Sequence, residues 1–300
     1  MTTAPDPRWP PASSLLTESA PTDRPAVALL GVPTFRFALS PWDGCDTPAR
    51  VRTALARYST WSYRDEVDLA EVAAIVDLGD VVDPDDGIAA VASALVHRPP
   101  DARLTAIVGG DNSATFGTMA ALAGRDLAHW GLVTLDAHHD LRDGHSNGSP
   151  VAELLAAGLP GTQVVQVGLS DFANSPAYAR RAADAGITCV TRAQLDERGV
   201  MAAIGDAVAI ASGDDRPVYV DIDLDVCDRA VVPACPAAAP GGLSARELRD
   251  AVYAAASSSS VAAIDFTEVD AARDAPDGRT VRLVALALLE AVAGVAARAA

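Results

Sequence analysis

The chain has 300 residues, half of them apolar, which is enough to bury the core of one large α/β domain or of two smaller ones. It carries 23 basic and 40 acidic residues, and the resulting formal charge of −17 argues against binding to nucleic acid or to anionic membranes. All the basic residues are arginine, so lysine Schiff-base chemistry and a P-loop lysine are excluded.

The first 26 residues are polar and rich in proline, without the basic and apolar regions of a secretory signal. We therefore expect a flexible leader over residues 1–26 and a single domain over residues 27–300.

No stretch reaches the ~18 continuous apolar residues of a membrane span. Four scattered cysteines do not indicate a disulfide framework. We expect a cytoplasmic protein with no nucleic-acid or membrane partner.

Short apolar runs typical of strands alternate with longer segments of helical period rich in Ala, Leu and Arg. In chain order, the sequence predicts strand Val27–Val32, helix Thr47–Tyr58, strand Val72–Val76, helix Gly87–His97, strand Leu104–Val108, helix Ser113–Leu127, strand Leu132–Leu135, helix Val151–Ala157, strand Gln163–Val167, helices Pro176–Ala185 and Gln194–Ala211, strand Val218–Asp221, helix Ala245–Ala256, strand Val261–Asp265 and helix Thr280–Ala297. This alternation predicts an α/β fold, a mainly parallel sheet with helices on both faces.

Polar clusters follow the predicted strands directly. They lie at Gly109–Ser113, Asp136–Asp140, Gly168–Asp171, Asp221–Asp225 and Asp265–Glu268. Ligand sites of parallel sheets collect at the carboxyl ends of the strands, so we expect these clusters to form one shared site.

Two of the clusters, Asp136-Ala-His-His-Asp140 and Asp221-Ile-Asp-Leu-Asp225, are rich in carboxylates. Carboxylates at alternate positions of an extended segment point the same way, and they repel one another unless a cation holds them. Two hard divalent cations would do so, and the pattern therefore predicts a two-metal hydrolase site. The alternative is a solvated acidic edge that binds calcium or no metal.

In this order, the clusters resemble the motifs of the ureohydrolase superfamily, which includes arginase, agmatinase and formimidoylglutamase. The family motifs G-G-D-[HN]-S, D-A-H-x-D and D-x-D-x-x-D and a strand-end glutamate match Gly109–Ser113, Asp136–Asp140, Asp223–Asp228 and Glu268. The resemblance implies a three-layer arginase-like fold and a homo-oligomer, trimer or hexamer. It also implies two Mn²⁺ ions per chain, which share bridging carboxylates and activate a water, and a small amidine or guanidine substrate.

Carried over by position, the resemblance implies that Asp136 and Asp223 bridge the two Mn²⁺ ions. Asp140 and Asn112 would complete the first metal site, and His138 and Asp225 would complete the second. Asn112 stands where arginase and agmatinase have His. An amide oxygen is a weaker Mn²⁺ ligand than imidazole, so we expect the first site to bind its metal less tightly. Alternatively, Asn112 caps the backbone and ligates nothing.

The likeness is greatest to formimidoylglutamase, which cleaves N-formimino-L-glutamate to L-glutamate and formamide in histidine catabolism. It rests on Asn112, on Asp140-Leu-Arg142, and on Asn147 before Gly148-Ser-Pro150, where arginase and agmatinase have His. Asp140 and Glu268 would be catalytic, with Glu268 pairing with the amidinium.

The remaining site residues are expected in the loop after Asp140. Arg142 would bind a substrate carboxylate, with Asn147 and Ser149 beside it, and His145 would shuttle protons. Alternatively, Arg142 pairs with Asp143, His145 lies in a surface loop, and Glu268 is an ordinary strand-end carboxylate.

Two other functions stay open. The chain could hydrolyse another guanidino compound, such as agmatine, guanidinobutyrate or arginine, or it could be a metal-depleted family member with a regulatory role. In this fold the loops of Cys45 and Cys235 border the mouth of the site, which raises the further hypothesis of a disulfide between them.

Overall fold

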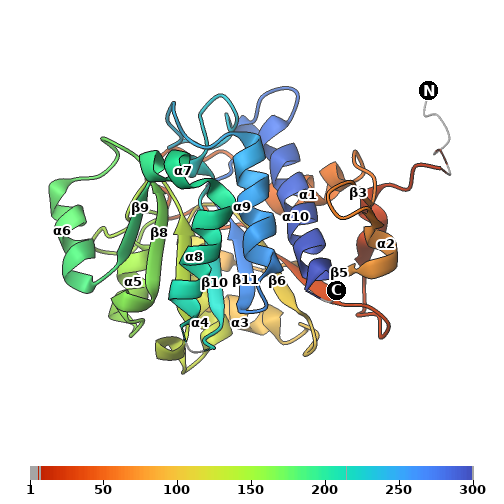
Figure 1. The fold of residues 1–300 in the computed structure, drawn as a ribbon, viewed down its shortest axis with the longest axis horizontal. Helices are drawn as coiled ribbons and strands as arrows, with labels where there is room; N and C mark the ends of the chain where they lie inside the picture. Colours follow the sequence, from red (N-terminus) through yellow and green to blue (C-terminus); the bar gives the residue numbers. More distant parts are fainter. Residues whose placement is uncertain (1–5, 7, 214, 299–300) are drawn as a thin grey trace.

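The computed structural model describes residue 6 and residues 8–213 and 215–298. At its centre lies a nine-stranded sheet in which all neighbouring strands are parallel (Figure 1). Its strands are β1 (Leu16–Thr17), β2 (Ala26–Val32), β5 (Ala74–Asp80), β6 (Leu104–Gly109), β7 (Gly131–Leu135), β8 (Val164–Leu169), β9 (Thr188–Thr191), β10 (Val218–Ile222) and β11 (Val261–Phe266). A separate antiparallel hairpin contains β3 (Trp61–Ser62) and β4 (Val67–Asp68).

Helices cover both faces of the sheet, so the fold has the three layers that the sequence predicted (Figure 1). One face carries α1 (Thr47–Leu55), α2 (Leu69–Val72), α7 (Arg192–Arg198), α8 (Val200–Ser212), α9 (Ala245–Ser257) and α10 (Arg279–Ala297). The other carries α3 (Ile88–Leu95), α4 (Ser113–Ala123), α5 (Pro150–Ala156) and α6 (Pro176–Ala185). Short 3₁₀ turns lie at Ala12–Leu15, Pro84–Asp86, Leu127–His129, Gly161–Gln163, Leu224–Val226 and Ala271–Arg273.

The elements follow from their local sequence. Strand β2 is apolar and buried along its whole length, as expected of a parallel strand covered on both faces. Ser244 and Glu247 form a capping box that begins α9, and Ser175 caps α6.

Helix α10 is the one described helix long and apolar enough to cross a membrane. However, 72% of its apolar window is buried inside the protein, where the helix packs against α9 and α1.

The structure differs from the predicted elements at several places, among them the unpredicted hairpin of β3 and β4. The single helix predicted over Gln194–Ala211 is two helices, because Gly199 has a φ of 78° and separates α7 from α8. Strand β9 was missed, since it is a short, partly exposed edge strand. The strand predicted at Val72–Val76 lies at Ala74–Asp80, after the short helix α2.

Part of the segment expected to be a flexible leader, residues 1–26, packs against the rest of the protein. Ala12 and Leu15 are buried in the core, and strand β1 pairs in parallel with β5 as an edge of the sheet. A few apolar side chains are sufficient to dock a polar, Pro-rich segment onto an existing core. Residues 1–5 and 7 lie outside the described part of the chain.

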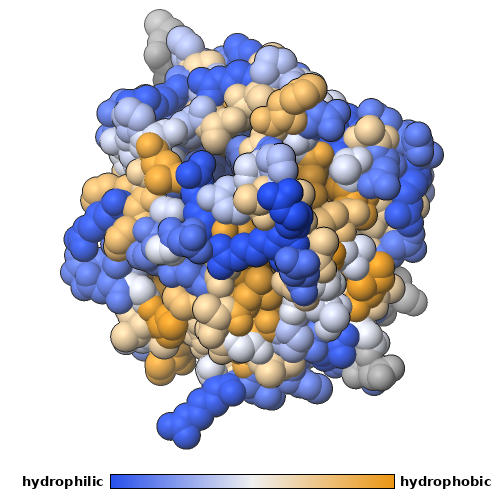
Figure 2. All heavy atoms as spheres, turned by 90° about the vertical axis from the view of Figure 1, so that its left-hand side faces the viewer, coloured by the Kyte–Doolittle hydropathy of each residue, from blue (hydrophilic) through white to orange (hydrophobic). Residues whose placement is uncertain are grey.

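The order of the strands explains where the site lies. Across the sheet they run β1-β5-β2-β6-β11-β10-β7-β8-β9. The five strands followed by polar clusters, β6, β11, β10, β7 and β8, are therefore consecutive neighbours, and their carboxyl ends meet at one edge of the sheet. On the flank that carries α6, small groups of hydrophobic residues are separated by hydrophilic ones (Figure 2).

Candidate metal centre and active-site cavity

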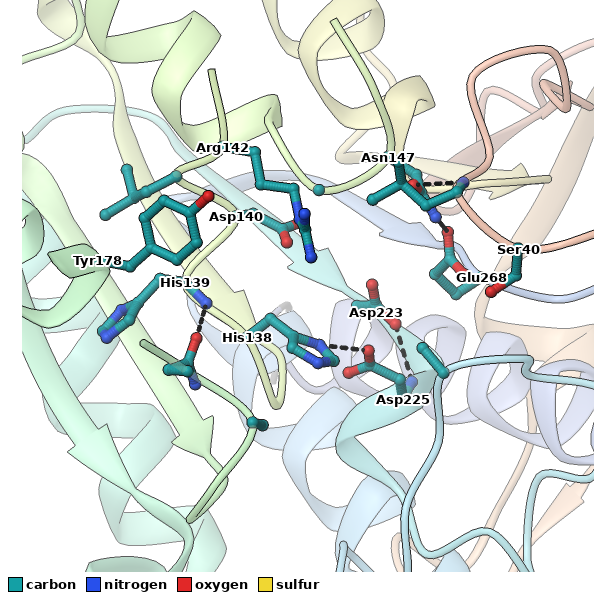
Figure 3. A pocket seen from close by; sticks show the side chains of 16 residues that line it. Ser40, His138, His139, Asp140, Arg142, Asn147, Tyr178, Asp223, Asp225 and Glu268 are labelled. Carbon is teal, nitrogen blue, oxygen red and sulfur yellow. Dashed lines mark hydrogen bonds and ion pairs between the residues drawn. The ribbon is translucent and has the colours of Figure 1, made fainter. Parts of the chain in front are cut away.

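A cavity of about 190 Å³ opens at this edge of the sheet (Figure 3). It is lined by Leu39, Ser40, His138, His139, Asp140, Leu141, Arg142, Asn147, Gly148, Ala173, Asn174, Tyr178, Asp223, Asp225, Ala237 and Glu268. These residues come from the loops after β2, β7, β8, β10 and β11 and from the first turn of α6. Members of three predicted clusters, Asp136–Asp140, Asp221–Asp225 and Asp265–Glu268, thus meet at this cavity. Asn112, from a fourth cluster, hydrogen-bonds to Asp140 and Glu268 of the lining.

Five residues expected to be metal ligands form two groups with metal-binding geometry. Asp136, His138 and Asp225 make one group, and Asp136, Asp140 and Asp223 make the other. Within each group the candidate ligand atoms lie within 4.8 Å of one another. Asp136 belongs to both groups, which is the position that a bridging carboxylate requires.

Backbone amides fix the orientation of these carboxylates. The amide of His138 donates to Asp136 at 2.6 Å, and the amide of Asp225 donates to Asp223 at 2.8 Å. The amide of Ala137 donates to Asp225 at 3.1 Å and so ties the two acidic loops together. Asp140 has a φ of 50°, a left-handed conformation that costs free energy in a residue other than glycine.

The candidate ligands form a buried cluster of carboxylates, whose ionised forms a bound cation would stabilise. Burial, together with the neighbouring carboxylates Asp140 and Asp225, raises the pKa of Asp136 well above its ordinary value. Burial and the charge of Asp225 likewise raise the pKa of Asp223. Burial lowers the pKa of His138, but its hydrogen bond to Asp225 and the surrounding acids outweigh this and raise it to about 9.

The donor set fits a pair of divalent metal ions. Oδ2 of Asp136 is buried and has no hydrogen-bond partner within the described residues. Buried carboxylates without a counter-charge are unfavourable, and a bound cation would remove both the repulsion and the missing contact. Several carboxylate oxygens with one imidazole nitrogen suit Mn²⁺, which accepts both kinds of ligand.

The amide of Asn112 is turned away from the role of metal ligand in this structure. Its Oδ1 accepts hydrogen bonds at 2.8 Å from the hydroxyls of both Thr115 and Thr267. Its Nδ2 donates to Asp140 at 2.7 Å. Ligation through Oδ1 would therefore require the amide to turn over, and Oδ1 would then face the Asp140 carboxylate with the cation between them.

Glu268 lines the same cavity as Asp223 and Asp225, and two hydrogen bonds hold its carboxylate. Its Oε1 accepts from the backbone amide of Asn112 at 2.9 Å and from the side-chain amide of Asn147 at 2.7 Å. The side chain is buried, and burial raises its pKa above the ordinary value. A φ of 59° directs Glu268 into the cavity (Figure 3). The second oxygen, Oε2, accepts no hydrogen bond from the described residues.

Arg142 lies in the cavity wall, and the structure does not pair it with Asp143. Asp143 instead accepts from Arg181 of α6 at 2.8 Å. The Arg142 side chain extends toward the centre of the site from the side where Tyr178 also lies (Figure 3). Its guanidinium is the one basic group other than histidine among the lining residues.

Besides the buried Asn112 and Asp136, two other predicted site residues, Ser149 and His145, lie outside the lining of this cavity. The Ser149 hydroxyl donates to the backbone carbonyl of Ser146 at 2.8 Å and holds the turn before α5. His145 pairs through Nδ1 with Glu153 at 2.6 Å, and its ring packs edge-on against Phe37, in the wall of a different pocket. In this conformation neither side chain faces the candidate ligands.

Several residues that support the site were not singled out from the sequence. Thr115 and Thr267 hold Asn112, and Tyr178 lines the cavity from α6. Tyr178 lies in the first turn of α6, the helix that follows the polar cluster after β8. This position at the carboxyl end of a strand could have identified it as a candidate site residue. Thr115 lies three residues after Asn112, so the spacing of the first turn of α4 was a signal for its contact with Asn112. Thr267 had no such signal, because it reaches Asn112 only after β6 has paired with β11.

The hypothesis of a disulfide is not realised in this structure. Cys45 and Cys235 are both free thiols, the first exposed and the second buried. Burial, with the charges of Asp223 and Asp225 nearby, raises the pKa of the Cys235 thiol, which disfavours the reactive thiolate.

Comparison with known proteins gives one consistent result. The sequence model of the Arginase family matches residues 25–294. Formimidoylglutamase of Halalkalibacterium halodurans is 32% identical over 258 residues, which are 82% of this chain and 80% of that protein. The crystal structure of formimidoylglutamase from Bacillus subtilis has a TM-score of 0.88 and 30% identity, covering 98% of this chain and 94% of that one. Formiminoglutamase of Trypanosoma cruzi with Mn²⁺ has a TM-score of 0.84, 21% identity and coverage of 97% and 99%, and so shares the fold.

Proposed function

Because the chain belongs to the arginase family and is a hydrolase that acts on the C–N bonds of linear amidines, we propose that its substrate is N-formimino-L-glutamate. The products would be L-glutamate and formamide, in the breakdown of histidine. The observation that carries the proposal is Arg142, a guanidinium that has no acidic partner among the described residues and lies in the wall of a cavity with four carboxylates. Guanidinium binds carboxylate bidentately and repels a cationic guanidine. We further propose a cytoplasmic homo-oligomer, trimer or hexamer.

We assign the metal ions to the two groups of ligands described above. Asp136 and Asp223 would be shared, Asp140 would complete the first site, and His138 and Asp225 the second. When bound, two Mn²⁺ ions would make a water between them more acidic and would stabilise the negative charge that develops during attack on the amidine. Asn112 would join the first site only after its amide turns over.

The chain's own residues would bind and orient the substrate. The free Oε2 of Glu268 would accept a hydrogen bond from the amidinium and hold its carbon over the metal centre. Asn147 and the backbone of Asn112 would keep Glu268 in place. Asp140, which lines the cavity, would take up the proton of the attacking water.

A product assay on a small panel of substrates tests the proposed function. The Mn²⁺-loaded protein should release formamide from N-formimino-L-glutamate and much less urea from arginine, agmatine or guanidinobutyrate. Protein treated with a chelator should be inactive and should recover when Mn²⁺ is restored. Faster release of urea than of formamide would contradict the choice of substrate, and activity without any metal would contradict the mechanism.

Glu268→Gln should lower kcat/KM by roughly 30- to 1,000-fold, since a charged partner of the amidinium is worth about 2–4 kcal/mol. Glutamine retains the oxygen that accepts from Asn112 and Asn147, so the fold and both metals should remain. Kinetics combined with metal analysis measure the effect. Unchanged kinetics would reduce Glu268 to a structural role, and loss of metal would mean that the substitution disturbs the ligands.

Asn112→His should tighten binding of the weaker Mn²⁺ ion. Imidazole is a better ligand than an amide, and the substitution removes the amide that now donates to Asp140. Titration of metal-free protein with Mn²⁺ should show a tight and a weak step in the parent, and a strengthened weak step in the variant. Two equal steps that the substitution leaves unchanged would count against the assignment of Asn112 to the first site.

A further inference from the structure

Two hydrogen-bond donors in the cavity wall have no partner among the residues that the structure describes. One is the guanidinium of Arg142, and the other is the hydroxyl of Tyr178 (Figure 3). Both side chains line the same cavity, and the Tyr178 hydroxyl lies on the side of its ring that faces Arg142. Donors left without acceptors at the rim of an acidic site are positioned for an anionic group of the ligand.

The fold holds the two donors in a fixed relation. Arg181, one turn after Tyr178 in α6, donates to the backbone carbonyl of Leu141 at 2.6 Å and to Asp143 at 2.8 Å. It thereby fastens α6 to the segment on either side of Arg142. At the start of the helix, Ser175 accepts from the amide of Tyr178 at 3.2 Å. The ring of Tyr178 packs against the buried core on this face of the sheet.

Gly148 keeps space for the Arg142 side chain. A Cβ atom at residue 148 would lie 2.7 Å from Cδ and 3.0 Å from Nε of Arg142. Any larger residue would displace the guanidinium from its present path. The backbone amide of Arg142 also donates to the carbonyl of Gly148 at 3.0 Å. The loop therefore fixes both the backbone and the side chain of Arg142.

Resting on the proposed function, we propose that Tyr178 is a substrate-binding residue that shares one carboxylate of the substrate with Arg142. The guanidinium would bind the carboxylate through two N–H groups, and the tyrosine hydroxyl would donate to a remaining lone pair. The opposite wall, formed by Asp223, Asp225 and Glu268, is acidic and suits the amidinium end. The cavity thus has an anion-binding side and a cation-binding side, which match an amidine that carries carboxylates.

Steady-state kinetics of Tyr178→Phe test this assignment. The substitution removes a single oxygen, and the loss of one hydrogen bond to a carboxylate should raise KM for N-formimino-L-glutamate roughly 10- to 100-fold with kcat nearly unchanged. N-butylformamidine has no carboxylate, so its KM should not change. Tyr63→Phe, at an exposed tyrosine outside the cavity lining, is the matched control and should behave as the parent. An unchanged KM for the dicarboxylate, or an equal rise for both substrates, would overturn the proposal.

A double-mutant cycle shows whether the two donors hold the same carboxylate. If they do, the effect of Tyr178→Phe should shrink when Arg142 is already alanine, because the carboxylate is then no longer held in place. Independent effects of the two substitutions would overturn the shared subsite.

Binding of glutarate separates this proposal from the proposed function. Calorimetry on the Mn²⁺-loaded protein should show glutarate binding that Tyr178→Phe weakens roughly 10- to 100-fold. If the parent does not hydrolyse N-formimino-L-glutamate but this binding still depends on Tyr178, the substrate is wrong and the subsite stands. If the parent releases formamide while neither KM nor glutarate affinity depends on Tyr178, the function stands and the subsite is overturned.

Discussion

Asp136→Ala and Asp223→Ala should each reduce turnover roughly a thousandfold or more, the largest loss that we expect from any single substitution. Asp136 belongs to both groups of candidate ligands, and Asp223 belongs to the group that contains Asp136 and Asp140. Removing either carboxylate takes away a contact that two cations would share, and the cations would then repel one another with less negative charge between them. Activity assays and metal analysis should show the loss together, with fewer than two Mn²⁺ ions retained per chain.

Asp184→Ala is the matched control for these variants. Asp184 is an exposed aspartate on α6, outside the cavity lining, and its removal should leave turnover and metal content unchanged. Retention of a substantial fraction of activity by Asp136→Ala would refute the two-metal mechanism. Loss of activity with full metal content would instead show that the carboxylate serves the substrate and not the metals.

The candidate ligands were predictable from the sequence because they are short-range features. Asp136, His138 and Asp140 follow one strand, and Asp223 and Asp225 follow another, so spacing alone puts them at strand ends. The parallel sheet then brings those ends together without further information. The same reasoning could not place side chains within the loops. His145 turns toward Glu153 and Phe37, and Ser149 turns toward Ser146.

The residues that the sequence did not reveal depend on long-range contacts. Asn112 accepts from Thr267, which is 155 residues away, and only the pairing of β6 with β11 makes them neighbours. Asp143 pairs with Arg181 and not with its sequence neighbour Arg142. Charge and spacing in the sequence do not decide which of the two arginines forms this pair. Similarly, nothing in the polar segment before β2 indicated that Ala12 and Leu15 are buried. The strand-end clusters thus locate the candidate metal centre, and the tertiary contacts determine which side chains line the cavity.

Metal-free protein should lose stability as the pH rises from about 4 to about 9. Burial and neighbouring carboxylates raise the pKa values of Asp136, Asp223 and Glu268, and the balance of contacts raises that of His138 to about 9. In the unfolded chain these groups return to ordinary values of about 4 for the acids and 6.5 for histidine. Over this range the folded protein therefore binds more protons than the unfolded chain, and its free energy of unfolding falls as pH increases.

Mn²⁺ should reverse this trend, because the metal binds only the deprotonated ligands and its stabilisation therefore grows with pH. At a hundredfold excess of metal over Kd, each site should add about 2.7 kcal/mol to the free energy of unfolding. Two sites should then raise Tm by roughly 10 °C at pH 8.5.

Thermal unfolding of chelated and Mn²⁺-loaded protein from pH 5 to pH 9 measures both trends. Asp136→Ala should show a shallower decline without metal and little response to Mn²⁺, since it lacks the carboxylate responsible for both. Stability of the metal-free parent that rises with pH, or a Tm indifferent to Mn²⁺ at pH 8.5, would mean that this buried acidic cluster is not a metal site.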